Sequence, residues 1–426
     1  MKMKKLKVLW LTNIIPENVC RYLNTKPSYA GGWIAGLYSS LSKTNLEFIF
    51  CFPNANKYIE GNISKTEKYF GIKMRRKDYM NYSCKIEKMF YAILCKERPD
   101  IIHIFGTEYP YCLEMVNAAY KLGDINKVII NIQGLVSFYQ YYFYAALPRN
   151  IICHRTLKEI IRKNNIYNQK KDFEKRGELE QNAIAKVKYI IGRTEWDEAC
   201  VKYINSDCQY IACNEILRSS FYNKSWEYNK CDKYTIFVSQ ANYPIKGFHF
   251  LLEAFENVKL NFPNAKIRVA GENILDLSKN IFSRNSYNKY ISNLITDKHI
   301  RENIEFLGKL SEEQMCMEYL KANVFISPSS IENSSNSISE AMLIGVPIIA
   351  SNVGGTNSIL KHQIEGYLYQ YDAPYMLAYY IKKMFSSPQE ACEMAKNAKS
   401  TAEKKFNRFE NAKTVQRIYH LVSNKD

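Results

Sequence analysis

Metal-binding and disulfide motifs are missing from this sequence. Its 12 cysteines are scattered, no two of them form a C-x-x-C pair, and only 6 histidines are present. None of these histidines lies at zinc-ligand spacing from a pair of cysteines. The cysteines are therefore expected to be free thiols in a reducing compartment, and neither a metal site nor a disulfide framework is predicted.

Long apolar runs are also missing. The chain begins MKMKKLKVLWLTNIIPEN, in which lysines precede an apolar stretch, but Thr12 and Asn13 interrupt it and no small-residue cleavage site follows. A buried first strand is predicted there instead of a signal peptide. No run approaches the roughly 20 apolar residues that cross a bilayer. The expected location is cytoplasmic, with peripheral contact at the inner face of the plasma membrane as an open alternative.

Glycine and proline are too few for a repetitive or low-complexity chain, at 17 and 12 of 426 residues. Hydrophobic residues make up 46% and charged residues 24%, which excludes wholesale disorder. A length of 426 residues predicts two or three domains.

Positive charge is concentrated in one half of the chain. The net charge is +17, and residues 1–230 carry 36 Lys and Arg against 22 Asp and Glu. Such a field favours an anionic partner, such as a phosphate-rich substrate or an acidic membrane. A solvated basic surface is the alternative explanation.

Short apolar, β-branched runs alternate with helical patterns along the whole chain, which predicts parallel sheets covered by helices. The predicted strands are residues 7–12, 46–52, 101–105, 128–133 and 189–192, followed by 234–238, 267–270, 304–307, 324–328 and 347–351. The fold class is therefore α/β, with two doubly wound, Rossmann-like domains facing across a cleft. The expected boundaries are an N-terminal domain at 1–218, a linker at 219–233, a C-terminal domain at 234–405 and a terminal helix at 406–426 that crosses back to the first domain.

One segment, residues 135–176, departs from this alternation. Aromatic residues come first, and Lys and Arg then alternate with Ile and Leu. This composition is typical of a segment that binds at a membrane interface. A helical pair with a hydrated outer face is the alternative.

The strongest motif lies in the string SSIENSSNSISEAMLIGVPIIASNVGG, residues 329–355. Glu332 stands in a polar loop after a predicted strand, and Glu340 follows on a helix. Small residues between them, 333–337, expose backbone N–H groups that favour an anion. Carboxylates accept hydrogen bonds from hydroxyl-rich ligands such as sugars.

This string resembles the E-x7-E motif of glycosyltransferase family 4, a retaining family with the GT-B fold. The likeness extends over nearly the whole chain and includes the strings PDIIHIFG, YPIKGFHFLLEAF and IEGYLYQYDAP. The strings GTEYP, IQGL, GRTEWD, CNEILRSSFY and SQANYPIKG resemble a subgroup that assembles bacterial surface polysaccharides, such as capsule.

The resemblance implies a site for a nucleotide diphosphate sugar. It implies catalytic roles for Glu332 and Lys246, with Lys246 neutralising the leaving diphosphate, and donor binding by Gly31, Gly32, Gln240, Asn336, Ser337 and Glu340. An isolated lysine or a glycine turn is the alternative at the less specific positions. One departure matters, because the family usually has an Arg five or six residues before this lysine, where Ala241 and Gln240 stand here.

Four further polar residues in the N-terminal half lie at or just after predicted strand ends and are candidates for the acceptor cleft. They are Glu108, Gln133, Arg193 and Glu215. Gln133 occupies a place where many family members have His, and its amide cannot take a proton near neutral pH. Structural ion pairs are the alternative role for the three charged residues.

The implied activity is a retaining, metal-independent transfer of a sugar from a UDP- or GDP-sugar to a glycan or lipid-linked acceptor, with no cofactor. Two alternatives stay open: another GT-B enzyme such as an epimerase or phosphorylase, and a scaffold whose donor site is impaired. No nucleic-acid-binding signature is present, so nucleic acid is not an expected partner.

Overall fold

The computed structural model describes residues 5–26, 28, 31–274 and 285–423. The chain divides into two compact units, each built from separate stretches. Unit 1 consists of residues 1–138, 172–218 and 406–426, and unit 2 of residues 139–171 and 219–405.

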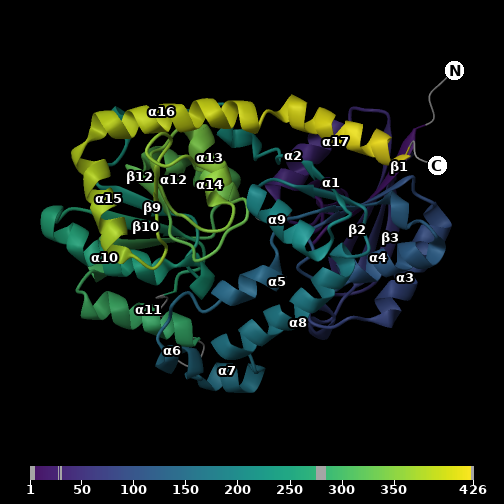
Figure 1. Cartoon of the computed structure of the whole chain (residues 1–426), viewed down its shortest axis with the longest axis horizontal. Helices are drawn as coiled ribbons and strands as arrows, with labels where there is room; N and C mark the ends of the chain where they lie inside the picture. The colour runs from purple at the N-terminus through teal and green to yellow at the C-terminus, as the bar shows by residue number, and fades with distance from the viewer. Residues whose placement is uncertain (1–4, 27, 29–30, 275–284, 424–426) are drawn as a thin grey trace. The chain divides into compact units, whose positions relative to one another are not determined.

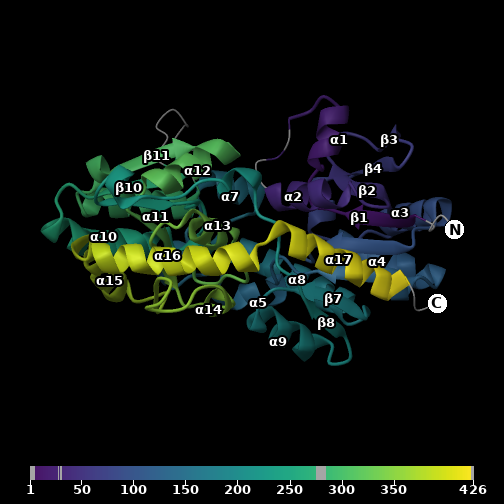
Figure 2. The same cartoon turned by 90° about the horizontal axis from the view of Figure 1, so that it is seen from above.

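Unit 1 contains a sheet with the strand order β3-β4-β2-β1-β5-β6-β7-β8. All neighbouring strands are parallel except β3, which is antiparallel to β4. Figure 2 shows β3 and β4 at one edge and β7 and β8 at the other. Its strands are β1 (Leu6–Leu11), β2 (Leu46–Asn54), β3 (Ile59–Ser64), β4 (Glu67–Lys73), β5 (Ile101–Phe105), β6 (Val128–Asn131), β7 (Tyr189–Gly192) and β8 (Gln209–Ala212).

Helices cover both faces of this sheet because its central strands are apolar on both sides, and β5 and β6 are buried at every residue. These helices are α1 (Glu17–Tyr22), α2 (Gly32–Leu41), α3 (Cys84–Glu97), α4 (Tyr111–Leu122), α5 (Val136–Tyr139), α8 (Ile166–Ile184), α9 (Glu195–Ile204) and α17 (Arg408–Ser423). The boundary between the units falls within α5 and α8.

Helix α17 completes the core of unit 1 although it lies at the other end of the sequence. Its residues Val415, Ile418 and Tyr419 are buried in the same cluster as Val8 and Trp10 of β1. It packs beside α2 (Figure 1). The Trp10 Nε1–H donates to the Tyr419 hydroxyl at 2.9 Å, so this contact combines apolar burial with a satisfied polar pair.

Unit 2 contains a fully parallel sheet with the order β11-β10-β9-β12-β13-β14. Its strands are β9 (Thr235–Val238), β10 (Lys266–Ala270), β11 (Ile304–Gly308), β12 (Val324–Ser327), β13 (Ile348–Ser351) and β14 (Tyr367–Tyr369). Its helices are α6 (Arg149–Cys153), α7 (Leu157–Arg162), α10 (Phe248–Asn261), α11 (Ser286–Asp297), α12 (Glu312–Lys321), α13 (Asn336–Ile344), α14 (Thr356–Ile359), α15 (Pro374–Ser386) and α16 (Pro388–Lys405).

Two sheets dominated by parallel strands confirm the predicted α/β class, and every predicted strand is present. The edge strands β3, β8 and β14 were not predicted, and neither was β4, which lies next to β3. Strand β3 alternates between half-buried and exposed residues, and β8 has no fully buried residue, so neither carries a continuous apolar run.

Two stretches lie elsewhere than the predicted boundaries would place them. Residues 139–171 were assigned to the N-terminal domain, but their contacts place them in unit 2. Residues 219–233, predicted as a linker, are packed onto unit 2. There the Trp226 indole donates to the Ala322 carbonyl at 2.7 Å, and the ring of Phe221 is fully buried.

Candidate functional site

The central polar site of unit 2 lies where the strand order reverses. After β9 the chain builds β10 and β11 on one side, and it then returns to place β12 on the other side of β9. Ligands of open α/β sheets bind at the carboxyl ends of the strands that flank such a reversal. The loop after β9 carries Lys246, and the loop after β12 carries Glu332.

Lys246 and Glu332 form an ion pair across these two loops. The Lys246 Nζ lies 2.5 Å from Glu332 Oε1, and the side chains are 20% and 11% exposed. Burial alone would lower the pKa of Lys246, but the Glu332 carboxylate and the Tyr243 hydroxyl together outweigh this effect and raise it. Lys246 is therefore a fixed positive charge that solvent still reaches. The Ser329 hydroxyl donates to the same Glu332 oxygen at 2.8 Å.

Gly247 allows the two loops to meet. Its φ is +64°, and a Cβ atom there would lie 1.8 Å from the carbonyl oxygen of Pro328. Any larger residue would push the Lys246 turn away from the end of β12. The Ser330 N–H donates to the Ile245 carbonyl at 2.8 Å and holds the loops in contact.

The other donor candidates of unit 2 lie on or beside the same loops. Asn336 and Ser337 occupy the first turn of α13, where backbone N–H groups point away from the helix. Glu340 follows on the second turn and is buried. Gln240 lies in the loop between β9 and Lys246 and is half-buried. The structure thus brings Lys246, Glu332, Asn336, Ser337, Glu340 and Gln240 to the carboxyl end of one sheet.

Sequence reasoning missed Tyr139, whose hydroxyl accepts a hydrogen bond from the backbone N–H of Asn333 at 2.7 Å. Nearby, the Ser330 hydroxyl donates to the Tyr142 carbonyl at 3.0 Å. Segment 139–171 is therefore anchored directly on the E-x7-E loop. A residue 194 positions away leaves no local signal of such a contact, although the aromatic composition of the segment is unusual.

The candidates of unit 1 also gather at strand ends, because β5, β6, β7 and β8 are consecutive neighbours in its sheet. Glu108 Oε1 accepts from the Gly134 N–H at 2.8 Å, and burial raises the pKa of its carboxyl group. The Arg193 guanidinium donates to the carbonyls of Ile132 and Gln133 at 3.1 and 3.2 Å. The Gln133 amide donates to Asn131 Oδ1 at 3.2 Å.

Arg193 and Glu215 form an ion pair at 2.8 Å with side chains only 3% and 4% exposed. Of the two roles considered from sequence, this geometry matches a structural ion pair. Because the guanidinium also binds two carbonyl groups, Arg193 is committed to holding the strand ends together and is not presented to solvent.

A second carboxylate in unit 1 was not predicted. Glu180 on α8 is buried, and it accepts from the Thr107 hydroxyl at 2.6 Å and from the Ser137 N–H and hydroxyl at 2.8 and 2.5 Å. Burial raises its pKa to about 7 despite these hydrogen bonds. It anchors the start of α5, and no sequence motif marks it.

Gly31 and Gly32 lie in unit 1, at the start of α2, whereas the other donor candidates lie in unit 2. Gly31 has a φ of +128°, and a Cβ atom there would meet the Ile14 side chain at 1.9 Å. A Cβ atom on Gly32 would meet the Arg218 side chain at 2.2 Å. Both positions need glycine for close packing in the structure itself.

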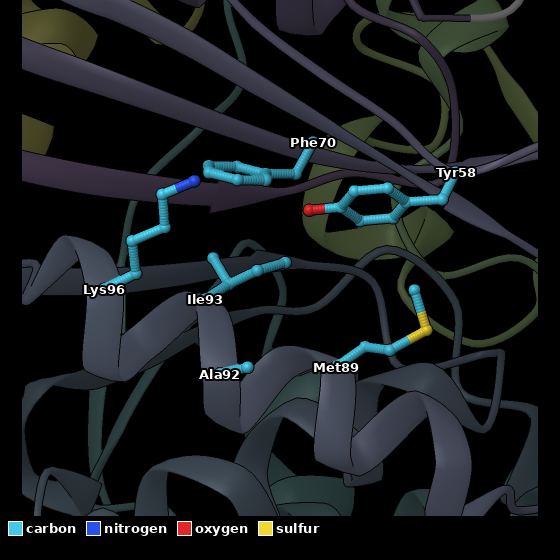
Figure 3. A pocket seen from close by; sticks show the side chains of 6 residues that line it. All are labelled: Tyr58, Phe70, Met89, Ala92, Ile93 and Lys96. Atoms are coloured by element: carbon cyan, nitrogen blue, oxygen red, sulfur yellow. The ribbon is translucent and has the colours of Figure 1, made fainter.

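A separate pocket of about 230 Å³ lies in unit 1 between α3 and β4 (Figure 3). Its lining is formed by Tyr58, Phe70, Met89, Ala92, Ile93 and Lys96. The Lys96 ammonium lies 5.6 Å from the centre of the Phe70 ring and 3.3 Å from the Glu60 carboxylate. This pocket is apolar and lies away from the polar strand ends.

Among the described residues, no group of three or more His, Cys, Asp or Glu side chains is arranged to hold a metal ion. Within the same described ranges, no helix is long and apolar enough to cross a membrane.

Comparisons with known sequences find similarity mainly in the part of the chain that forms unit 2. Residues 220–401 match the family described as "Glycosyl transferases group 1". The YtcC protein of Bacillus subtilis is 28% identical over 194 residues, which is 45% of this chain and 46% of that protein. The capsular polysaccharide biosynthesis glycosyltransferase CapM of Staphylococcus aureus is 26% identical over 165 residues, covering 38% of this chain and 39% of CapM. The chain therefore matches less than half the length of either relative.

Solved structures agree with the fold over nearly the full chain. Sucrose-phosphate synthase from Thermosynechococcus elongatus superposes with a TM-score of 0.74 at 16% identity, covering 99% of this chain and 100% of that one. Anabaena HepE in complex with UDP-glucose has a TM-score of 0.65 at 13% identity, covering 98% and 100%. The fold is GT-B, and residues 220–401, which match the group 1 glycosyl transferase family, contain Lys246, Glu332 and Glu340.

Proposed function

We propose that the protein is a retaining glycosyltransferase that moves a sugar from a nucleotide diphosphate sugar to a glycan or lipid-linked acceptor. The observation that carries this proposal is the solvent-accessible pair of Lys246 and Glu332 at the strand reversal of unit 2. A fixed cation beside a carboxylate and the first turn of a helix suits a ligand with phosphate at one end and hydroxyl groups at the other.

Each residue has a separate role in this proposal. Lys246 and the N–H groups at the start of α13 stabilise the negative charge that develops on the departing diphosphate. Glu332 accepts hydrogen bonds from hydroxyl groups of the donor sugar, and Glu340 from the ribose. Because Lys246 and Glu332 pair with each other in the structure, a bound diphosphate competes with Glu332 for the ammonium group.

The reaction keeps the donor's anomeric configuration. The bond between the anomeric carbon and the phosphate oxygen breaks, and the acceptor oxygen bonds to the same face of that carbon. The acceptor's proton passes to the leaving phosphate, so the diphosphate acts as the base. Neither a metal ion nor a cofactor takes part in this scheme.

Two comparisons support the choice of substrates. HepE has been crystallised with UDP-glucose, which favours a UDP-sugar over a GDP-sugar, and CapM takes part in capsular polysaccharide biosynthesis. We therefore place the activity in cell-surface polysaccharide assembly at the cytoplasmic side of the membrane. The excess of Lys and Arg in residues 1–230 fits an acceptor that carries a lipid diphosphate.

The test is a thermal-shift and hydrolysis panel of the purified chain with UDP-, GDP-, ADP- and CMP-sugars. One of these nucleotide sugars is expected to raise the melting temperature of the wild type and to be hydrolysed slowly. Both the stabilisation and the hydrolysis are expected to be lost in Lys246→Met and in Glu340→Gln. Lys266→Met, which replaces an exposed lysine at the start of β10, is the matched control and retains both effects.

Other outcomes distinguish the alternatives. An altered free sugar formed without any acceptor identifies an epimerase, and a requirement for inorganic phosphate identifies a phosphorylase. If no nucleotide sugar binds, the missing Arg near Ala241 has impaired the donor site and the chain acts as a scaffold. Once an acceptor is found, NMR of the product tests the stereochemistry, and an inverted anomeric centre contradicts a retaining mechanism. Loss of activity when a chelator is added contradicts a metal-independent one.

A further inference from the structure

Helix α7 of unit 2 exposes its aliphatic face and buries a carboxylate, which is the reverse of an ordinary surface helix. Leu157, Ile160 and Ile161 stand at positions i, i+3 and i+4 and therefore share one face. Their exposed fractions are 57%, 54% and 82%. Surface helices normally bury such a face and expose their charged residues.

The opposite face of α7 carries the buried carboxylate of Glu159. Its Oε1 accepts from the N–H and hydroxyl of Ser286 at 3.0 and 2.8 Å, and its Oε2 accepts from the Thr156 N–H at 2.9 Å. Both oxygens are satisfied, and they attach α7 to the start of α11. Polar contacts thus hold the helix in an orientation that keeps its aliphatic side outward.

Among the described residues of unit 2, no other exposed aliphatic side chains form a comparable face. Leu260, on α10, is 77% exposed but is flanked by polar neighbours. Single apolar residues of this kind are normal on protein surfaces, whereas a contiguous aliphatic face marks an interaction site. Figure 1 shows α7 at the lower margin of the ribbon, next to α6.

Cations surround the aliphatic face. Segment 139–171 contains seven Lys and Arg residues and a single carboxylate, the buried Glu159. Arg155, Arg162 and Lys163 are exposed, and they lie within or next to α7. An aliphatic face bordered by positive charge complements a surface that is apolar inside and anionic outside, which is the structure of an acidic lipid bilayer.

We propose that α7 and its flanking cations, residues 155–163, form the surface by which the protein docks on anionic membranes. Leu157, Ile160 and Ile161 enter the boundary between headgroups and acyl chains, and Arg155, Arg162 and Lys163 contact lipid phosphates. This docking does not depend on the proposed sugar transfer. It places the membrane contact on the unit that contains Lys246 and Glu332.

The first test measures sedimentation of the full chain with vesicles. Vesicles of phosphatidylcholine with about 30% phosphatidylglycerol are compared with pure phosphatidylcholine at about 0.1 M salt. The wild type is expected to bind the anionic vesicles at least about tenfold more tightly. The double variant Ile160→Ser/Ile161→Ser is expected to lose about tenfold of that binding, whereas Leu260→Ser loses none.

The second test separates charge from apolar insertion. Arg162→Gln/Lys163→Gln is expected to weaken binding to anionic vesicles about tenfold while leaving any binding to pure phosphatidylcholine unchanged. The control, Lys396→Gln/Lys404→Gln, removes two exposed lysines of α16 and retains wild-type binding. All these residues are exposed, so thermal melting of each variant is expected to match the wild type.

A direct probe of insertion is Ile161→Trp, whose added fluorescence is expected to shift to the blue with anionic vesicles, whereas Leu260→Trp shows no shift. Three results overturn the proposal: equal binding to both vesicle types, equal losses in the variants and their controls, or no binding at all. A dimer in vesicle-free solution that Ile160→Ser/Ile161→Ser converts to monomer also overturns it, because a second copy of the chain then covers α7.

Discussion

The two units each hold an ion pair at the carboxyl ends of their strands, and the two pairs differ in their access to solvent. Arg193 and Glu215 in unit 1 are 3% and 4% exposed, whereas Lys246 and Glu332 in unit 2 are 20% and 11% exposed. We call the Arg193 pair closed, because solvent does not reach it, and the Lys246 pair open. A closed pair stabilises the fold only where its geometry offsets the cost of removing two charges from water. In an open pair, a charged ligand can replace one of the two side chains as the partner of the other. This difference in exposure is the reason why we propose the chemistry for the pair in unit 2 and a structural role for the pair in unit 1.

The largest expected effect comes from breaking the closed pair. Arg193→Met leaves the Glu215 carboxylate buried without its cation and is expected to lower the free energy of unfolding by about 3–5 kcal/mol. Chemical denaturation measures this loss. Lys383→Met, which breaks a pair whose side chains are 34% and 39% exposed, is the control and is expected to cost about 1 kcal/mol or less. A similar small loss in Arg193→Met would remove the contrast between the units.

Breaking the pair of Lys246 and Glu332 is expected to affect activity more than stability. Lys246→Met removes the charge that we propose to stabilise the leaving diphosphate, and it is expected to lower turnover of the nucleotide sugar by about 10²–10³-fold. Its free energy of unfolding is expected to fall by less than that of Arg193→Met, because the side chains of Lys246 and Glu332 are 20% and 11% exposed. Turnover and denaturation are measured on the same preparation. Full turnover in Lys246→Met would show that the pair has no role in the chemistry.

Acidification sharpens the comparison through one buried histidine in each unit. Burial lowers the pKa of His103 in unit 1 to about 3 and that of His249 in unit 2 to about 4, from the usual 6.5. Below pH 6.5 the histidines of the unfolded chain bind protons. The two buried histidines of the folded chain bind protons only when the pH approaches their lowered pKa values. The contribution of each histidine to stability is therefore expected to fall from pH 6.5 towards pH 4, by up to about 1.4 kcal/mol per pH unit.

Denaturation of wild type and His249→Gln across this pH range isolates one of the two contributions. The His249 Nε2–H donates to the Ala145 carbonyl at 2.8 Å, and a glutamine amide can make a similar bond. The variant is expected to have a shallower pH dependence than the wild type. Parallel curves would show that His249 does not stay neutral in the folded protein.

The smallest expected effect concerns the anchor of the E-x7-E loop. Tyr139→Phe removes the acceptor of the Asn333 N–H and is expected to cost about 1 kcal/mol of stability. KM for the nucleotide sugar is expected to rise several-fold while kcat stays within about twofold, because the loop loses order but no reacting group. Tyr141→Phe, at a 73% exposed tyrosine, is the control. A fall in kcat without a rise in KM would contradict a positioning role.

Much of the fold could be predicted because buried parallel strands leave continuous apolar runs, as in Ile101–Phe105 and Ile348–Ser351. The hairpin of β3 and β4 could not, since residues 59–64 alternate without a buried position. The placement of segment 139–171 was also beyond sequence reasoning. It rests on single polar contacts, such as Glu159 with Ser286, across 127 residues.

The polar residues of the unit 2 site could be predicted because they lie in specific sequence motifs. The E-x7-E string and the Lys246-Gly247 pair identified side chains that the structure brings together from 86 residues apart. The unit 1 candidates came from position alone, and strand-end polar residues serve structure as readily as function. Glu180 and Tyr139 escaped notice because a buried carboxylate or a single hydroxyl has no pattern in the surrounding sequence.

The interrupted course of the chain has a consequence for its synthesis. Because the chain passes between the units after residues 138, 171, 218 and 405, neither unit is a continuous stretch. The side chains of Val8 and Trp10 emerge early from the ribosome, but Val415 and Tyr419, which cover them, are translated last among the described helices. At about 5–20 residues per second, that apolar surface stays open for tens of seconds. The nascent chain is therefore expected to depend on chaperones until α17 appears.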